Sequence, residues 1–193
     1  MSAAASEGSS TPAAARTLSL DDVYRAAERR GMLLRLTSVG PAFSVTATAF
    51  GAEDPVQVGT LDGFVAPPPF GGILHLDSVR VYNSRLRGAF RGRAQTPFGI
   101  ALLLGAAAFV HANSFGCTRA ELLAIDDSNE YAERLVTYYR RLGFTAVRSV
   151  GSNGWRDVPD LLVWGGVGTR MDADIPSMID RWSRAISRGT DEV

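Results

Sequence analysis

The chain has 193 residues with 20 basic and 20 acidic side chains, so its formal net charge is zero. A neutral protein has no overall attraction to nucleic acid or to a membrane surface, and this length fits one domain with a sizeable core. The single cysteine excludes an internal disulfide, and the two histidines exclude a multi-histidine metal site.

The N-terminal residues 1–17 are predicted to be a disordered tail, because they are rich in Ala and Ser. They contain no apolar stretch of the kind found in a secretory signal. We therefore expect a cytoplasmic protein. Import into a plastid or mitochondrion is the alternative that an Ala/Ser-rich N-terminus suggests. Residues 18–193 are predicted to form a single domain.

The first predicted element is a helix that begins at Leu20. Ser19 can cap it, Asp22 can complete a capping box, and Gly31 follows its end. Alternating apolar residues and flanking turn residues then predict three strands, which we place at 43–50, 56–65 and 73–81.

Positive charge is concentrated in the next segment. Between Ser78 and Ala120 there are six arginines and no acidic residue, and residues 85–93 are expected to form a basic loop. Forked guanidinium groups suit phosphates. A solvated surface loop explains the same composition, and Arg interleaved with Gly and Phe is also found in RNA-binding segments.

A long apolar helix follows this segment. Thr96 offers a capping hydroxyl and Pro97 occupies the first helical position, so the helix should begin there and run to about Asn113. Its apolar run, 98–110, is shorter than the roughly 20 residues that a membrane span requires. The free N–H groups of such a helix start favour a phosphate, and Gly99 would allow close approach.

The remaining elements are predicted to alternate between strands and helices. A strand over 121–125 precedes a helix for which Asp127 and Glu130 form a capping pair and which ends at Gly143. Strands are expected at 145–150 and 161–164, and a last helix begins at 174–176.

The string NEYAERLVTYYRRLGF, residues 129–144, resembles the Asn-x-x-Ala…Tyr-x-x-x-Gly-Phe signature of the GCN5-related N-acetyltransferases (GNATs). Gly99 and Ala101 match the glycine-led helix start of that family, whereas Thr96 stands where Arg or Gln is usual. The resemblance covers about 75 residues. It implies an α/β fold with a mixed, mostly antiparallel sheet, flanking helices and two central parallel strands that splay apart.

The resemblance also implies that acetyl-CoA is the co-substrate, that no metal is used, and that acetyl moves to a primary amine by direct attack. Asn129 would lie near the pantetheine arm, and Tyr139 would protonate the leaving thiolate. The apolar face of the helix favours Tyr138 as the buried neighbour and leaves Tyr139 to point elsewhere. The implied coenzyme-binding residues are Val79, Val81, Arg87, Thr96, Phe98, Gly99, Ile100, Ala101, Asn129 and Tyr139.

The strand 73–81 carries the candidate acceptor residues. With a period of two, residues 75, 77, 79 and 81 should share one face. The segment Leu-His-Leu-Asp resembles the arylalkylamine N-acetyltransferases, which suggests His75 as the base, because imidazole titrates near neutral pH. Asp77 would then anchor a cationic acceptor. A lone histidine in a strand is also commonly a core residue.

Two alternatives remain at the level of sequence. One is a non-catalytic CoA-binding module, suggested by the altered helix start, and the other is an RNA-binding protein that uses residues 85–93. We expect a small-molecule or peptide amine as partner, no membrane association and no nucleic acid. The sequence carries no signal for oligomeric state.

Overall fold

The computed structural model describes residues 17–50, 54–90, 95–125, 129–150 and 167–188. Within these ranges the side chains of 87–88, 129–132 and 187–188 are outside the described set. Several expectations fall outside it: the tail over 1–16, residues 91–93 of the basic segment, the capping pair at Asp127 and Glu130, and the strand at 161–164.

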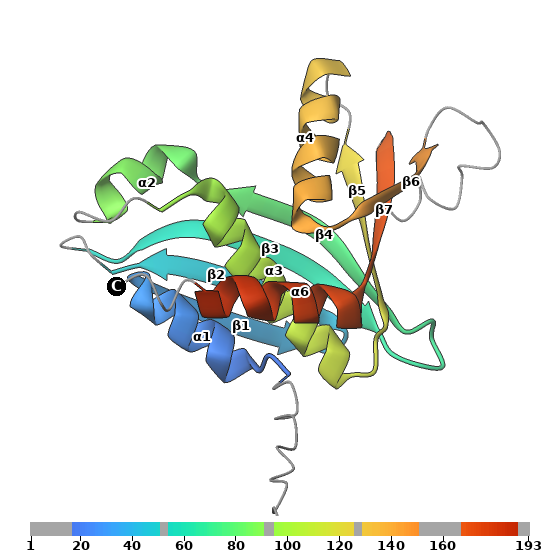
Figure 1. Ribbon diagram of the computed structural model, residues 1–193, viewed down its shortest axis with the longest axis horizontal. Helices are drawn as coiled ribbons and strands as arrows, with labels where there is room; N and C mark the ends of the chain where they lie inside the picture. The colour runs from blue at the N-terminus through green and yellow to red at the C-terminus, as the bar shows by residue number, and fades with distance from the viewer. Residues whose placement is uncertain (1–16, 51–53, 91–94, 126–128, 151–166, 189–193) are drawn as a thin grey trace, which may run out of the picture.

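Seven strands form one sheet in the order β1-β2-β3-β4-β5-β7-β6 (Figure 1). All neighbours pair antiparallel except β4 and β5, which are parallel. The predicted mixed, mostly antiparallel sheet is confirmed. The strands are β1 (Met32–Val39), β2 (Ala42–Ala49), β3 (Val56–Ala66), β4 (Ile73–Val81), β5 (Arg119–Ile125), β6 (Thr145–Val150) and β7 (Gly168–Asp174).

The helices begin where their capping residues predict. Ser19 and Asp22 form both bonds of a capping box on α1 (Leu20–Arg29). Thr96 caps α3 (Pro97–Ser114), α4 (Asn129–Leu142) ends at Gly143 with a φ of 118°, and α6 (Ile175–Arg188) follows β7 directly. These boundaries agree with the predicted ones to within a few residues.

The expected basic loop is partly wrong, because residues 83–89 form a helix, α2 (Asn83–Ala89). Ala89 is buried and Leu86 packs against the core, so two apolar side chains among the arginines hold this turn of chain to the sheet. The guanidinium of Arg85 lies over the Tyr82 ring and donates to the Gln57 carbonyl at 3.1 Å. A loop without regular structure therefore does not describe residues 83–89, although Asn83 to Arg85 are exposed.

The core lies between the sheet and α3. Helices α1 and α6 lie on the same side of the sheet as α3, which they both contact (Figure 1). Trp182 of α6 packs on Phe109 of α3, with 4.8 Å between ring centroids, and a Cβ on Gly105 would come within 3.0 Å of the indole. Among the described residues α3 is the one helix long and apolar enough to cross a membrane, but it is mostly buried in this core.

A β-bulge interrupts β4 at Asp77. Ser78 pairs with Asp62 of β3 and Leu76 pairs with the adjacent Gly63, so Asp77 has no partner in β3. One extra residue reverses which face the following side chains occupy. The prediction that residues 75, 77, 79 and 81 share one face is therefore wrong.

Candidate functional site

The parallel strands β4 and β5 separate halfway along their length. Their pairing runs from Ile73 with Arg119 to Leu76 with Leu122 and stops there. Beyond this point, among the described residues, β4 pairs only with β3, and β5 pairs only with β7. The predicted splay is thus confirmed. We call this separation the fork; backbone groups along its inner edges can pair with an extended ligand.

Val79 and Val81 lie on the part of β4 beyond the fork. Because of the bulge, their side chains pack against the core below α3, and Val79 pairs with the buried Leu61 of β3. What these two residues offer at the fork is their backbone. Their assignment as coenzyme-binding residues stays a prediction.

The start of α3 lies beside the end of β4. Gly59, which pairs with Val81, would bring a Cβ to within 3.1 Å of Ile100. The Thr96 hydroxyl accepts from the Gly99 N–H at 3.1 Å, and of the described atoms a Cβ on Gly99 would meet only that hydroxyl oxygen, at 3.3 Å. The helix start is therefore open in front of Gly99, as an approaching anion requires.

Other predicted residues of this helix start differ in exposure. Ile100 and Ala101 are buried in the core, so only their backbone could meet a ligand, whereas Phe98 is partly exposed. The Phe98 ring meets the edge of Tyr138 on α4, with 5.9 Å between centroids. This contact joins the two helices that flank the fork. The side chain of Arg87 is outside the described residues.

The two tyrosines of α4 are arranged opposite to expectation. Tyr139 is only 8% exposed and packs edge-on against Phe144, whereas Tyr138 is the partly exposed residue that reaches α3. Burial raises the pKa of Tyr138 to about 12. Tyr138 also borders a groove of about 590 Å³ along α4, together with Arg134 and Arg141.

Asn129 occupies the first position of α4, as predicted, but its side chain is outside the described residues. Its backbone position follows the end of β5, which places the helix entry next to the open end of the fork.

His75 lies on the face of the sheet away from α3 and is 1% exposed. Its ring stacks on Phe64 of β3, with centroids 4.4 Å apart and planes 18° apart. Nδ1 lies 3.2 Å from Oε1 of Glu121 on β5. His75 is therefore a buried, oriented histidine directly below the fork.

Asp77, at the bulge, borders a shallow pocket of about 460 Å³. Asp62 contributes a second carboxylate, whose Oδ2 accepts from the Ser78 hydroxyl at 3.1 Å, and Phe43, Phe64 and Val39 supply apolar walls. None of the described lining residues is cationic. The pocket suits a cationic group attached to an apolar body.

The structure adds two residues that the sequence prediction missed, Glu121 and Arg170. Oε2 of Glu121 accepts from Arg170 Nη2 at 2.7 Å, and Arg170 Nε donates to Asp172 at 3.2 Å. A glutamate in the otherwise apolar predicted strand 121–125 was the only local signal. Within the described ranges, no group of three His, Cys, Asp or Glu side chains could hold a metal ion.

The strand order, the single parallel pair that splays and the helix start beside it define a GNAT-like fold. No family model matches the sequence, and no curated protein matches it. Among solved structures, the chain is similar to an acetyltransferase of the GNAT family from Staphylococcus aureus, at 13% identity and a TM-score of 0.47 over 69% of this chain and 68% of that one.

It is also similar to nourseothricin acetyltransferase, at 15% identity and a TM-score of 0.47 over 76% of this chain and 85% of that one. The aminoglycoside 6'-N-acetyltransferase from Enterococcus faecium is 17% identical, with a TM-score of 0.41 over 71% of this chain and 74% of that one. The fold is assigned from strand order and pairing, not from these similarities.

Proposed function

We propose that the chain is an N-acetyltransferase of the GNAT superfamily that transfers acetyl from acetyl-CoA to a primary amine. The observation that carries this proposal is the fork, bordered by the open helix start at Gly99. An extended amide-containing ligand with a diphosphate group fits these two features together, because one offers backbone pairing and the other offers free N–H groups.

The residues present fit acetyl-CoA. Gly99 leaves space for a phosphate, and the Thr96 hydroxyl can accept from the helix or donate to an anion. The backbone of Val79 and Val81 would pair with the pantetheine arm. When bound, acetyl-CoA supplies an activated acetyl group as a thioester.

The acceptor is proposed to enter from the opposite face of the sheet. Asp77 and Asp62 give the pocket there a negative field, and Phe64 and Phe43 suit an apolar body. We infer that Asp77 contacts the ammonium group of the acceptor, because it borders the pocket directly. His75 is proposed as the base, but its ring lies beneath Phe64, so proton transfer to it requires Phe64 to move or a water molecule to intervene.

Tyr139 is proposed to protonate the thiolate. It comes from the helix that flanks the fork and lies one turn before Gly143, at the position that the sequence signature implies. A phenol hydroxyl is a suitable general acid for a thiolate, because their unperturbed pKa values are of the same order.

A non-catalytic coenzyme-binding module is the second candidate. The observation in its favour is that the Thr96 hydroxyl already accepts from the Gly99 N–H, a donor that a phosphate would otherwise use. Such a protein would bind acetyl-CoA without turnover.

Calorimetric titration with acetyl-CoA, followed by a thiol-release assay with a panel of amines, separates the candidates. The panel should include aromatic amines, diamines, aminoglycosides and a peptide with a free N-terminus. Binding with amine-dependent thiol release supports the acetyltransferase. Binding without release by any amine indicates the non-catalytic module, and the absence of binding refutes both.

His75→Ala provides the matching test of the base. Loss of the acid limb of the pH–rate profile is expected, with acetyl-CoA affinity retained, because a base acts in turnover rather than in coenzyme binding. An unchanged profile would assign His75 to the core alone.

A further inference from the structure

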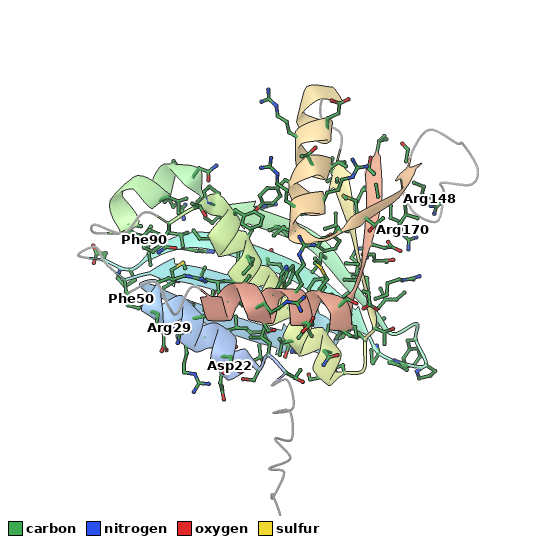
Figure 2. All side chains as sticks on the ribbon, in the orientation of Figure 1. Asp22, Arg29, Phe50, Phe90, Arg148 and Arg170 are labelled. Carbon is green, nitrogen blue, oxygen red and sulfur yellow. The ribbon has the colours of Figure 1, made fainter. Side chains whose placement is uncertain are left out.

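Glu121 is the centre of a partly buried ionic network that joins three strands. Its side chain is 13% exposed, with His75 of β4 on one carboxylate oxygen and Arg170 of β7 on the other. The Arg170 guanidinium also binds Asp172, and Arg119 approaches Glu121 at 3.9 Å. Figure 2 shows Arg170 on the β7 side of the molecule.

The network occupies a defined position in the sheet. His75 and Glu121 are paired residues of the parallel strands, and only one further pair, Leu76 with Leu122, separates them from the fork. The His75 imidazole and the Glu121 carboxylate are therefore held at the base of the fork.

Glu121 is negatively charged in this environment. Burial alone would raise its pKa, but the hydrogen bond from His75 and the positive charges of Arg170 and Arg119 together hold the pKa below the ordinary value. An ionised carboxylate only accepts hydrogen bonds. Nδ1 of His75 must then be the protonated ring nitrogen, which leaves the lone pair of the neutral ring on Nε2.

The ring plane is fixed by a second, independent contact. Phe64 stacks on the imidazole with nearly parallel planes, so rotation of the ring would cost both this stacking and the hydrogen bond to Glu121. A histidine held in one tautomer and one plane is oriented as a proton acceptor requires.

We propose that Glu121 is a positioning residue: it holds His75 as the Nδ1–H tautomer at the base of the fork, with Nε2 as the proton acceptor. The catalytic part of this inference rests on the proposed acetyl transfer, whereas the orientation of His75 does not. In the proposed step the ammonium proton of the acceptor passes to Nε2, and the free amine keeps its lone pair for attack. The resulting imidazolium is stabilised by the Glu121 carboxylate, which stays ionised.

The described charged groups around the pair lie on β5 and β7. Of the described residues, Arg119 lies on β5 with Glu121, and Arg170 and Asp172 lie on β7. On the β3 side the neighbour is the uncharged Phe64. Arg170 is shared between the carboxylates of Glu121 and Asp172, so its positive charge supports the ionised form of Glu121.

The direct test is nitrogen-15 NMR of the imidazole ring in the full chain. The wild-type protein should show the Nδ1–H tautomer of His75, identified by comparison with His75→Gln. In Glu121→Ala the spectrum should shift toward the Nε2–H tautomer, which free imidazole side chains favour. A wild-type His75 in the Nε2–H form, or a spectrum unchanged by Glu121→Ala, would overturn the proposal.

Kinetics supply the second readout. Glu121→Ala is expected to lower kcat by about 10- to 100-fold, as removal of carboxylates that orient metal-binding histidines does, with KM for acetyl-CoA retained. Glu121→Gln, which keeps an acceptor oxygen without the charge, should fall between that variant and the wild type. Asp180→Asn, an exposed carboxylate paired with Arg184 on α6, is the matched control and should be unaffected.

The proposed acetyl transfer and the orientation of His75 by Glu121 can be refuted separately. An inactive wild-type protein with the Nδ1–H tautomer would remove the proposed function but keep the orientation by Glu121. An active protein in which Glu121→Ala keeps full kcat would refute the positioning role, whatever its tautomer.

Discussion

Gly99→Glu tests the coenzyme site most directly, because the folded protein can accommodate the change. Gly99 is at the third position of α3 and is not among the glycines with positive φ, so its backbone suits any residue. The nearest obstacle to a Cβ is the Thr96 hydroxyl oxygen at 3.3 Å, which must yield by a few tenths of an ångström.

The expected effects on stability and on binding have opposite signs. Replacing a helical glycine stabilises by about 0.5–1 kcal/mol, and an acidic residue in the first turn adds about 0.3–1 kcal/mol through the helix dipole. Against a bound diphosphate, one negative charge at about 4 Å costs about 4 kcal/mol at an effective dielectric constant of 20. Since about 1.4 kcal/mol corresponds to tenfold, CoA affinity should fall by about 10²- to 10³-fold.

Calorimetric titration with CoA and thermal unfolding followed by circular dichroism measure the two effects. Gly99→Ala separates the added Cβ from the added charge, and Ala185→Glu adds the same charge to an exposed position on α6 as a matched control. Unchanged CoA affinity in Gly99→Glu, with the fold intact, would refute the assignment of the site. Lost affinity together with a lost fold would refute the claim that the position tolerates a side chain.

Four further predictions concern the rest of the site and the core. Tyr139→Phe should lower kcat by about 10²- to 10⁴-fold, the range for a general acid, without weakening acetyl-CoA binding, and an equal loss in the Tyr138→Phe control would mean that the wrong tyrosine was chosen. Asp77→Asn should raise KM for a cationic acceptor but not for acetyl-CoA in steady-state assays; an unchanged acceptor KM would remove its anchoring role. The pKa of Glu121 lies below its ordinary value of 4.5, so the ionised group stabilises the fold above that pH and this contribution disappears as pH falls through the lowered pKa. The difference in Tm between wild type and Glu121→Gln should accordingly shrink in acid, and a constant difference would contradict the linkage. Trp182→Ala should cost about 3–5 kcal/mol in urea unfolding. Trp182→Phe keeps one aromatic ring but loses part of the indole and its 3.1 Å bond to a carbonyl at the end of α4, so it should cost less, with about 1 kcal/mol from the lost bond; a negligible cost of the alanine variant would place α6 outside the core.

The elements with strong local signals were predictable from the sequence. The strand 73–81 has the predicted bounds, and α3 begins at the predicted residue, because a capping hydroxyl followed by proline acts within one turn. Likewise Gly143 ends α4 in the expected left-handed conformation. Each of these features depends on residues that are neighbours in the chain.

The edge strand β1 was not predicted, for a physical reason. Its apolar residues lie on both faces, so Leu33 and Val39 are exposed while Met32 and Leu34 are buried, and no clean alternation marks it. Strand β7, which was also not predicted, contains Arg and two Asp residues, and the Glu121 partner of Arg170 lies 49 residues away in the chain.

The arrangement of the site depended on two facts that periodicity cannot supply. A bulge at Asp77 changes the face of every later residue in β4, and its position is set by pairing with β3. The register of the parallel pair brings His75 to Glu121, 46 residues later in the chain. Local patterns fix neither the bulge nor this register, which is why His75 and Asp77 were predicted as site residues and Glu121 was not.

The bulge also bears on how transfer could occur. It directs the side chains of Val79 and Val81 toward α3, on the side of the proposed coenzyme site, while His75 and the pocket of Asp77 face the opposite side of the sheet. The two substrates would then meet across the fork, with no enzyme nucleophile needed between them.

Cys117, the only cysteine, is buried at the closed end of the parallel pair, where its thiol donates to the Ile73 carbonyl at 3.5 Å. Burial raises the pKa of this thiol. Since the thiolate is the reactive form of cysteine, this residue is unsuited to carry an acetyl group, which agrees with the proposed direct transfer.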